Sequence, residues 1–160
     1  MKTTKSILVL LSATLLFTAC KKQEPTPPAG VVGLSSNIYT VTPAAWGLSG
    51  LNGQEAAFIT DTWLNDPIND GVEVFVSGYP DGKWMGMPAS NLVQTGDYVE
   101  YLYSNQQIEI VYDGTPSPGI NLYIKVVVIP PAIMKQHPNT NWKDYDQVEA
   151  LIEAQKGSSN

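Results

Sequence analysis

The sequence is poor in the residue types that most functional sites need. It has no arginine, a single histidine and a single cysteine, and fifteen acidic residues outnumber nine lysines. Nucleic-acid binding depends on clustered Lys and Arg side chains that neutralise phosphates, and arginine is the favoured reader of base edges. Zinc sites draw on several Cys and His side chains. The composition therefore argues against nucleic-acid binding and against a zinc centre, and we expect no cofactor.

A long hydrophobic run is missing as well. The apolar stretch from Ile7 to Phe17 has eleven residues, whereas a helix that crosses a bilayer core needs about twenty. Two lysines precede this stretch, and the small residues Thr18 and Ala19 follow it. A basic start, a short apolar run and small residues are typical of a secretory signal peptide. The sequence predicts a signal peptide over residues 1–19.

The only cysteine follows this segment directly. Thr18-Ala19-Cys20 resembles the lipobox of bacterial lipoproteins, and the resemblance implies cleavage before Cys20 and acylation of its sulfur, with Phe17 where the family usually has Leu, Val or Ile. An ordinary secretory signal with a chance cysteine, or a buried core cysteine, are the alternatives. Because two or more acyl chains hold a protein firmly on a membrane, we expect membrane lipid to be a permanent partner. The expected location is the cell envelope, at the outer membrane.

The mature chain is predicted to be one acidic domain on a short tether. Residues 20–30 include two lysines and three prolines, a composition that favours an extended chain of about 3.1 Å per residue. Removal of the signal peptide leaves seven lysines against fifteen acidic residues, a formal charge of −8. Residues 31–156 have a typical length for one domain. Residues 157–160 are predicted to be a disordered tail.

The domain is predicted to be mainly β. Apolar and polar residues alternate with a period of two in several segments, which is typical of half-buried strands. The run from Leu122 to Ile129 is apolar on both faces except for Lys125, and this indicates a central strand. A short polar connection at residues 104–106 predicts an antiparallel hairpin. The predicted strands are residues 37–41, 72–77, 83–87, 99–103, 108–112 and 122–129.

Helical periodicity occurs near the C-terminus. Pro130 and Pro131 end the last predicted strand, because neither can donate a ladder hydrogen bond. A loop and then one helix are predicted, from Trp142 to about residue 155, with Thr140 or Asn141 as its cap. A short helical turn is possible at residues 60–64. Together these elements predict an antiparallel β-sandwich-like domain of about seven strands with one C-terminal α-helix.

Five segments follow one another in a recognisable order: a strand after a glycine at 70–76, a Trp-containing segment at 84–88, a Tyr-rich hairpin, a closing strand at 122–130, and Asn-Trp-x-x-Tyr at 141–145. This order resembles the all-β module of small Bacteroidetes-type lipoproteins, which often follows collagen-like repeats. The likeness covers residues 57–153, although this chain lacks collagen repeats and has Met87 where the family has Leu. The resemblance implies an all-β fold and an envelope location, and it implies no activity.

The acid-rich segment at residues 61–71 raises the question of a calcium site, because hard cations bind clustered oxygen ligands. If Gly71 takes the turn position of an EF-hand loop, Asp66 falls on the first ligand position. Ile68 and Ser77, however, fall on two other ligand positions. A capped turn explains the same residues, and we favour it over a cation site.

A hydrolase is the least supported reading. His137 is the only histidine, and no serine or nucleophile-elbow pattern accompanies it. We interpret it as a solvated loop residue. Pairs of carboxylates suited to glycoside hydrolysis arise by chance among fifteen acids. The sequence therefore predicts no catalytic residue and no enzyme.

Aromatic residues are the one suggestive class. Packing alone enriches them in strands, and the resemblance favours a packing role for Trp84. Tyr79 and Trp84, however, flank the predicted turn at residues 80–82, and a turn on a rigid scaffold presents side chains well. We name Tyr79 and Trp84 as candidate ligand-binding residues. The function predicted from the sequence is a non-enzymatic structural or interaction module that contacts another envelope protein or a glycan; the alternative is a glycan-binding accessory lipoprotein, and a hydrolase comes third.

Overall fold

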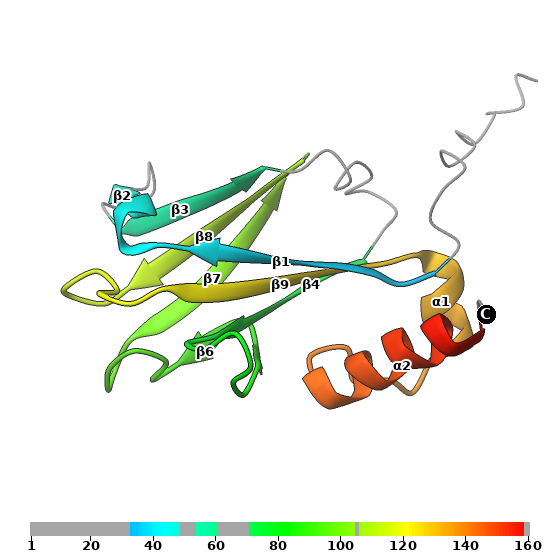
Figure 1. Cartoon of the computed structure of the whole chain (residues 1–160). Coiled ribbons are helices and arrows are strands. Elements are labelled where there is room, and N and C mark those ends of the chain that lie inside the picture. The colour runs from blue at the N-terminus through cyan, green and yellow to red at the C-terminus, as the bar shows by residue number, and fades with distance from the viewer. Residues whose placement is uncertain (1–32, 49–53, 61–70, 105, 159–160) are drawn as a thin grey trace, which may run out of the picture.

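The computed structural model describes residues 33–48, 54–60, 71–104 and 106–158. These residues form two antiparallel sheets, with helices beside one of them (Figure 1). The strands are β1 (Ser35–Val41), β2 (Gly47–Leu48), β3 (Glu55–Thr60), β4 (Gly71–Ser77), β5 (Met85–Gly86), β6 (Ala89–Ser90), β7 (Tyr98–Ser104), β8 (Gln107–Asp113) and β9 (Leu122–Ile129). The helices are a 3-10 turn η1 (Pro43–Ala45), α1 (Pro131–Gln136) and α2 (Tyr145–Ser158).

One sheet has four strands in the order β1-β9-β4-β5, and the other has five in the order β2-β3-β8-β7-β6. The sandwich-like fold with a C-terminal helix is confirmed. Strand β9 lies between β1 and β4 and pairs with each over seven residues, as expected for a central strand. Strands β7 and β8 form the predicted hairpin.

Two hydrophobic clusters hold these layers together. The larger lies between the two sheets, and the smaller lies between the outer face of the four-stranded sheet and the two α-helices. Strand β9 supplies both: Ile124 and Val126 to the larger cluster, Val127 and Ile129 to the smaller. Burying one such side chain contributes about 1.5–3 kcal/mol. We call the four-stranded sheet the covered sheet and the five-stranded sheet the open sheet.

The strand count was underestimated. The described residues contain nine strands. Strand β3 and the two-residue strands β2 and β6 were not predicted, and the predicted strand at 83–87 is only Met85–Gly86. Strand β3 begins with Glu55-Ala56-Ala57, and alanine is depleted in strands. Both alanines are buried, one on each face. The segment therefore shows no alternation that a reader of the sequence could recognise.

The helices also depart from expectation. The segment after Pro130 is not a loop, because Pro131 opens α1; proline is favoured in a first helical turn, where its missing N–H costs nothing. Helix α2 begins at Tyr145 rather than Trp142, and it ends three residues later than predicted, inside the expected tail. Its cap is Asp144, whose Oδ1 accepts backbone N–H groups two and three residues ahead at 3.1 and 3.3 Å. Thr140 and Asn141 precede the helix and do not cap it.

Several predictions lie outside the described residues. They are the signal peptide at 1–19, Cys20, the tether at 20–30, and residues 61–70 of the acid-rich segment, which include most of the suggested turn at 60–64. Within the described ranges, no helix combines the length and the apolar character that crossing a membrane requires.

Candidate functional site

The two predicted ligand residues lie in different surroundings. The turn between them is present, since the Gly82 N–H donates to the Tyr79 carbonyl at 3.1 Å. Tyr79 is 71% exposed. Trp84 is half-buried, and its ring stacks on Tyr145 of α2 with centroids 5.7 Å apart and planes 19° from parallel. Tyr79 therefore faces solvent, while Trp84 contributes to the packing of the helix, as the family resemblance implies.

A hollow of about 340 Å³ lies between the turn after β4 and the start of α2. Its lining combines the stacked rings of Trp84 and Tyr145 with both lysines and acids, among them Lys83, Lys143 and Asp146. Gly86 allows this arrangement, because a Cβ there would lie 2.4 Å from the Lys143 carbonyl oxygen. The hollow therefore brings aromatic rings and charges of both signs to one place on the surface.

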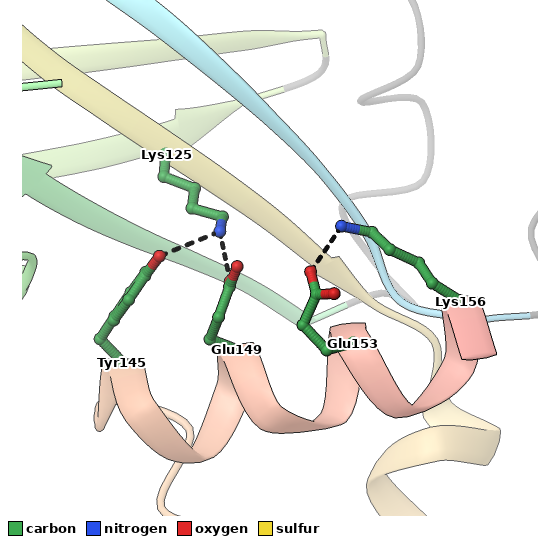
Figure 2. Close-up of polar contacts among 5 residues, drawn as sticks. All are labelled: Lys125, Tyr145, Glu149, Glu153 and Lys156. Atoms are coloured by element: carbon green, nitrogen blue, oxygen red, sulfur yellow. Dashed lines mark hydrogen bonds and ion pairs between the residues drawn. The ribbon is translucent and has the colours of Figure 1, made fainter. Parts of the chain in front are cut away.

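Lys125 is the principal polar link between the covered sheet and α2 (Figure 2). It is 5% exposed, and its ammonium forms an ion pair with Glu149 and donates to the Tyr145 hydroxyl at 3.2 Å. The same ammonium lies 5.0 Å from the centroid of the Tyr145 ring, a cation–π distance. Tyr145 also meets Phe75 edge-on at 5.4 Å. Lys125, the one charged residue of β9, therefore has its ion-pair and hydrogen-bond partners on α2.

Glu73 of β4 is a half-buried acid two residues before Phe75, on the same side of the covered sheet. Burial raises its pKa, and the nearby charge of Lys143 lowers it by a smaller amount. On the inner side, the Tyr101 hydroxyl donates to the Val72 carbonyl at 2.9 Å. Burial, and then the charge of Glu73, raise the pKa of Tyr101 to about 12. Tyr101 therefore remains a neutral hydrogen-bond donor and is not activated as a nucleophile.

A buried carboxylate organises the loop before β7. Asp97 accepts backbone N–H groups from Leu92 at 2.8 Å, Val93 at 2.7 Å and Gln94 at 3.0 Å, and its Oδ2 lies 3.4 Å from the Tyr112 hydroxyl that donates to it. Burial raises the pKa of Asp97, but these hydrogen bonds together lower it below its ordinary value of 3.8. The sequence showed a turn here and gave no signal of the buried carboxylate. The hydrogen bonds that Asp97 accepts come from its own loop and from Tyr112, which indicates a structural role.

His137 lies at the C-terminal end of α1, where its backbone N–H donates to the Ile133 carbonyl at 3.0 Å. It follows the helix as the C-cap residue, outside any helix or strand, and it is half-buried. Across the ranges that the structure describes, no group of three or more His, Cys, Asp or Glu side chains could hold a metal ion.

The outer face of the open sheet carries a feature that the sequence reading missed. Phe58 of β3 and Leu102 of β7 both lie opposite Glu109 of β8, so the three share one row. Phe58 is 56% exposed and Leu102 is 41% exposed. The alternation of residues 99–103 placed Leu102 on the outward face, but β3 was not recognised, and the row could not be assembled without it.

No family model, curated protein or solved structure matches this chain.

Proposed function

We propose that the protein is an envelope lipoprotein, attached to the outer membrane through acylated Cys20, that acts as a non-enzymatic interaction module. The observation that carries this proposal is the row on the open sheet in which the exposed Phe58 and Leu102 lie on either side of Glu109. A single exposed apolar residue is ordinary, whereas several on one face make that face a candidate interaction site.

The difference between the outer faces of the two sheets supports the same proposal. The outer face of the covered sheet packs on α1 and α2, whereas the open sheet presents Phe58, Leu102 and Tyr98 to solvent. Side chains on paired strands are held more rigidly than side chains on loops, which suits a recognition surface. Turnover of an envelope glycan or peptide by the purified protein would contradict the non-enzymatic part of the proposal.

The anchor is tested by Cys20→Ser. The variant loses its acylation site, and no segment of the mature chain is long and apolar enough to replace it. We expect it to move from the detergent phase to the aqueous phase in detergent phase partitioning. Lys22→Ser is the control and stays in the detergent phase, because one lysine contributes only about 1 kcal/mol near anionic lipid. Retention of Cys20→Ser in the detergent phase would disprove the anchor.

Glycan binding is the second candidate, and the hollow beside Trp84 favours it, with the exposed Tyr79 nearby on the same turn. Tyr79→Ala is the sharper variant, because an exposed ring can be removed without loss of stability. Trp84→Ala removes a packed ring and costs up to about 3–5 kcal/mol. We expect Tyr79→Ala to melt with the parent and to lose binding to immobilised mannan or dextran. A parent protein that binds neither polysaccharide removes this candidate.

A further inference from the structure

Two lysines without an ion-pair partner line the hollow between the turn after β4 and the start of α2. Within the described ranges, Lys125 and Lys156 form ion pairs with acids of α2. The other described lysines are Lys83, Lys135 and Lys143; all three are exposed, and none forms an ion pair with a described residue. Of these three, Lys83 and Lys143 line the hollow. Positive charge that is free to meet a ligand is therefore concentrated at this place.

The two acids that line the same hollow belong to the N-terminal end of α2. Asp144 caps the helix, and its Oδ2 also accepts a hydrogen bond from the Gln147 side chain at 3.0 Å. Asp146 lies in the first turn, where a carboxylate offsets the partial positive charge of a helix N-terminus. Burial raises the pKa of the nearby Glu73 and the charge of Lys143 lowers it by less, but no ion pair joins these two described residues. The lysines are thus the lining charges that neither a helix end nor an ion pair neutralises.

Two aromatic rings and a small volume limit what else the hollow can hold. Trp84 and Tyr145 stack on each other, and both line the hollow. Aromatic side chains offer a large, rigid apolar surface, against which the C–H groups of a sugar ring can pack. The volume of about 340 Å³ is at the low end for small-molecule sites, which range over about 300–1,000 Å³. The ligand that fits is a short unit and not a long chain.

We propose that this hollow binds a negatively charged sugar unit, with its anionic group on Lys83 and Lys143 and its ring beside Trp84. This inference rests on the glycan-binding candidate above and adds the charge of the glycan. Hydrogen bonds from an ammonium to an anion are shorter and stronger than neutral ones. The mature chain has a formal charge of −8, so its overall charge repels anions, and binding of one requires a local group of lysines.

The position of the hollow along α2 favours a glycan over a lipid headgroup as the source of the anion. Helix α2 begins at Tyr145, beside the hollow, and close to its other end Gln155 accepts the N–H of Leu34 at 2.7 Å. A rise of about 1.5 Å per residue separates Tyr145 from Gln155 by about 15 Å. Under the proposed anchor the tether joins the domain beside Leu34, so the hollow lies at the end of α2 away from the membrane attachment.

The test uses the mature chain with Cys20→Ser, short oligomers of galacturonic acid, and the same oligomers as methyl esters. The esters keep the sugar ring and lose the charge. In isothermal titration calorimetry we expect the acidic oligomers to bind about tenfold more tightly than the esters, and added salt to weaken that binding. Equal affinity for the two forms, or tighter binding of cationic glucosamine oligomers, would overturn the inference.

Substitutions of single lysines locate the site. Lys83→Gln and Lys143→Gln should each weaken binding of the acidic oligomers about tenfold and leave the melting temperature unchanged, because both side chains are exposed. Lys135→Gln is the matched control, since it removes an exposed lysine on α1 outside the hollow, and it should bind as the parent does. Asp146→Asn removes an acid from the lining and should tighten binding, which no loss of folding would produce. Equal losses in all three lysine variants would mean binding without a site and would reject the proposal.

Two further probes separate the remaining outcomes. Phosphatidylglycerol vesicles that bind the parent, but bind neither Lys83→Gln nor Lys143→Gln, would replace the sugar with a lipid headgroup and overturn the inference. Binding of dextran without binding of the acidic oligomers would keep the glycan candidate and reject the charge assigned to it. Absence of binding to every sugar would reject both, while the partitioning result for Cys20→Ser and the proposal for the open sheet would stand.

Discussion

The outer face of one sheet is covered by helices and the outer face of the other is exposed to solvent, and the sequences of the two central strands reflect this difference. Strand β9 of the covered sheet is buried on both faces, and its sequence is almost wholly apolar. Strand β8 of the open sheet alternates between core residues such as Ile108 and Ile110 and outward residues such as Glu109. A strand's pattern therefore indicates whether a second layer lies behind it.

Each sheet also carries residues that depart from its own pattern. Under the helix, Lys125 is a charge in an apolar strand, and α2 neutralises it with Glu149. On the open face, Phe58 and Leu102 are apolar residues in solvent. The first exception is resolved within the chain and stabilises the fold. The second remains on the surface. Ile38 of β1 is also exposed, but on the open sheet two such residues share one row, and this is why we propose recognition there.

The largest effect is expected where the two sheets meet. Ile124 of β9 is fully buried in the shared core, and truncation of a buried isoleucine costs about 2–5 kcal/mol because it leaves a cavity. Ile124→Ala should therefore lower the urea midpoint and the melting temperature substantially, while Ile38→Ala should stay within about 0.5 kcal/mol of the parent. A shift of Ile124→Ala within error would mean that β9 is not the central strand.

The next effect tests the link between the covered sheet and its helix. Glu149→Gln leaves the Lys125 ammonium buried without its counter-ion, and such a loss costs about 1–3 kcal/mol. Lys125→Met should cost less, because it removes the charge and keeps the volume of the side chain. Urea unfolding of both variants gives the order. If Lys125→Met were the less stable of the two, the ion pair would contribute more than the burial of its charge costs.

The smallest effect belongs to the open sheet and depends on pH. The folded pKa of Asp97 is depressed, so its contribution to stability is complete above its unfolded value of 3.8 and is lost as the pH falls through the folded pKa. Asp97→Asn should cost about 1–2 kcal/mol at pH 7, and the difference from the parent should shrink below about pH 4. The difference measured by urea unfolding at pH 7 and at pH 3 checks this. A cost that stays constant between them would show that the charge of Asp97 is not what its loop requires.

The sequence predicted the parts of the fold that rest on local patterns. Strands β4, β7, β8 and β9 have clear alternation or a continuous apolar run, and all were placed within one or two residues. The elements that were missed have local signals pointing elsewhere. Ala56 and Ala57 give β3 no strand-like pattern. Pro131 follows the end of β9 and is also the first residue of α1.

The candidate site was less predictable, because its contacts join distant parts of the chain. The turn between Tyr79 and Trp84 was correct, but the ring that stacks on Trp84 belongs to Tyr145, about sixty residues later in the chain at the start of α2. The row of Phe58, Glu109 and Leu102 depends on a three-strand register that no single segment contains. Local turn chemistry located a candidate residue, and only the tertiary structure decided its exposure.

The pairing of β1 with β9 also sets how the domain bears mechanical load. The described chain enters β1 at Ser35, next to Leu34, whose N–H donates to the Gln155 side chain at 2.7 Å. Tension from a membrane tether would arrive at that end and run along the strand. Antiparallel ladder hydrogen bonds lie perpendicular to the strands, so the pairs from Ser35 to Val41 would share the force in shear instead of opening one after another. Under the proposed anchor, a partner bound to the open sheet would then be restrained through the packed core, and the tension would pass through β1.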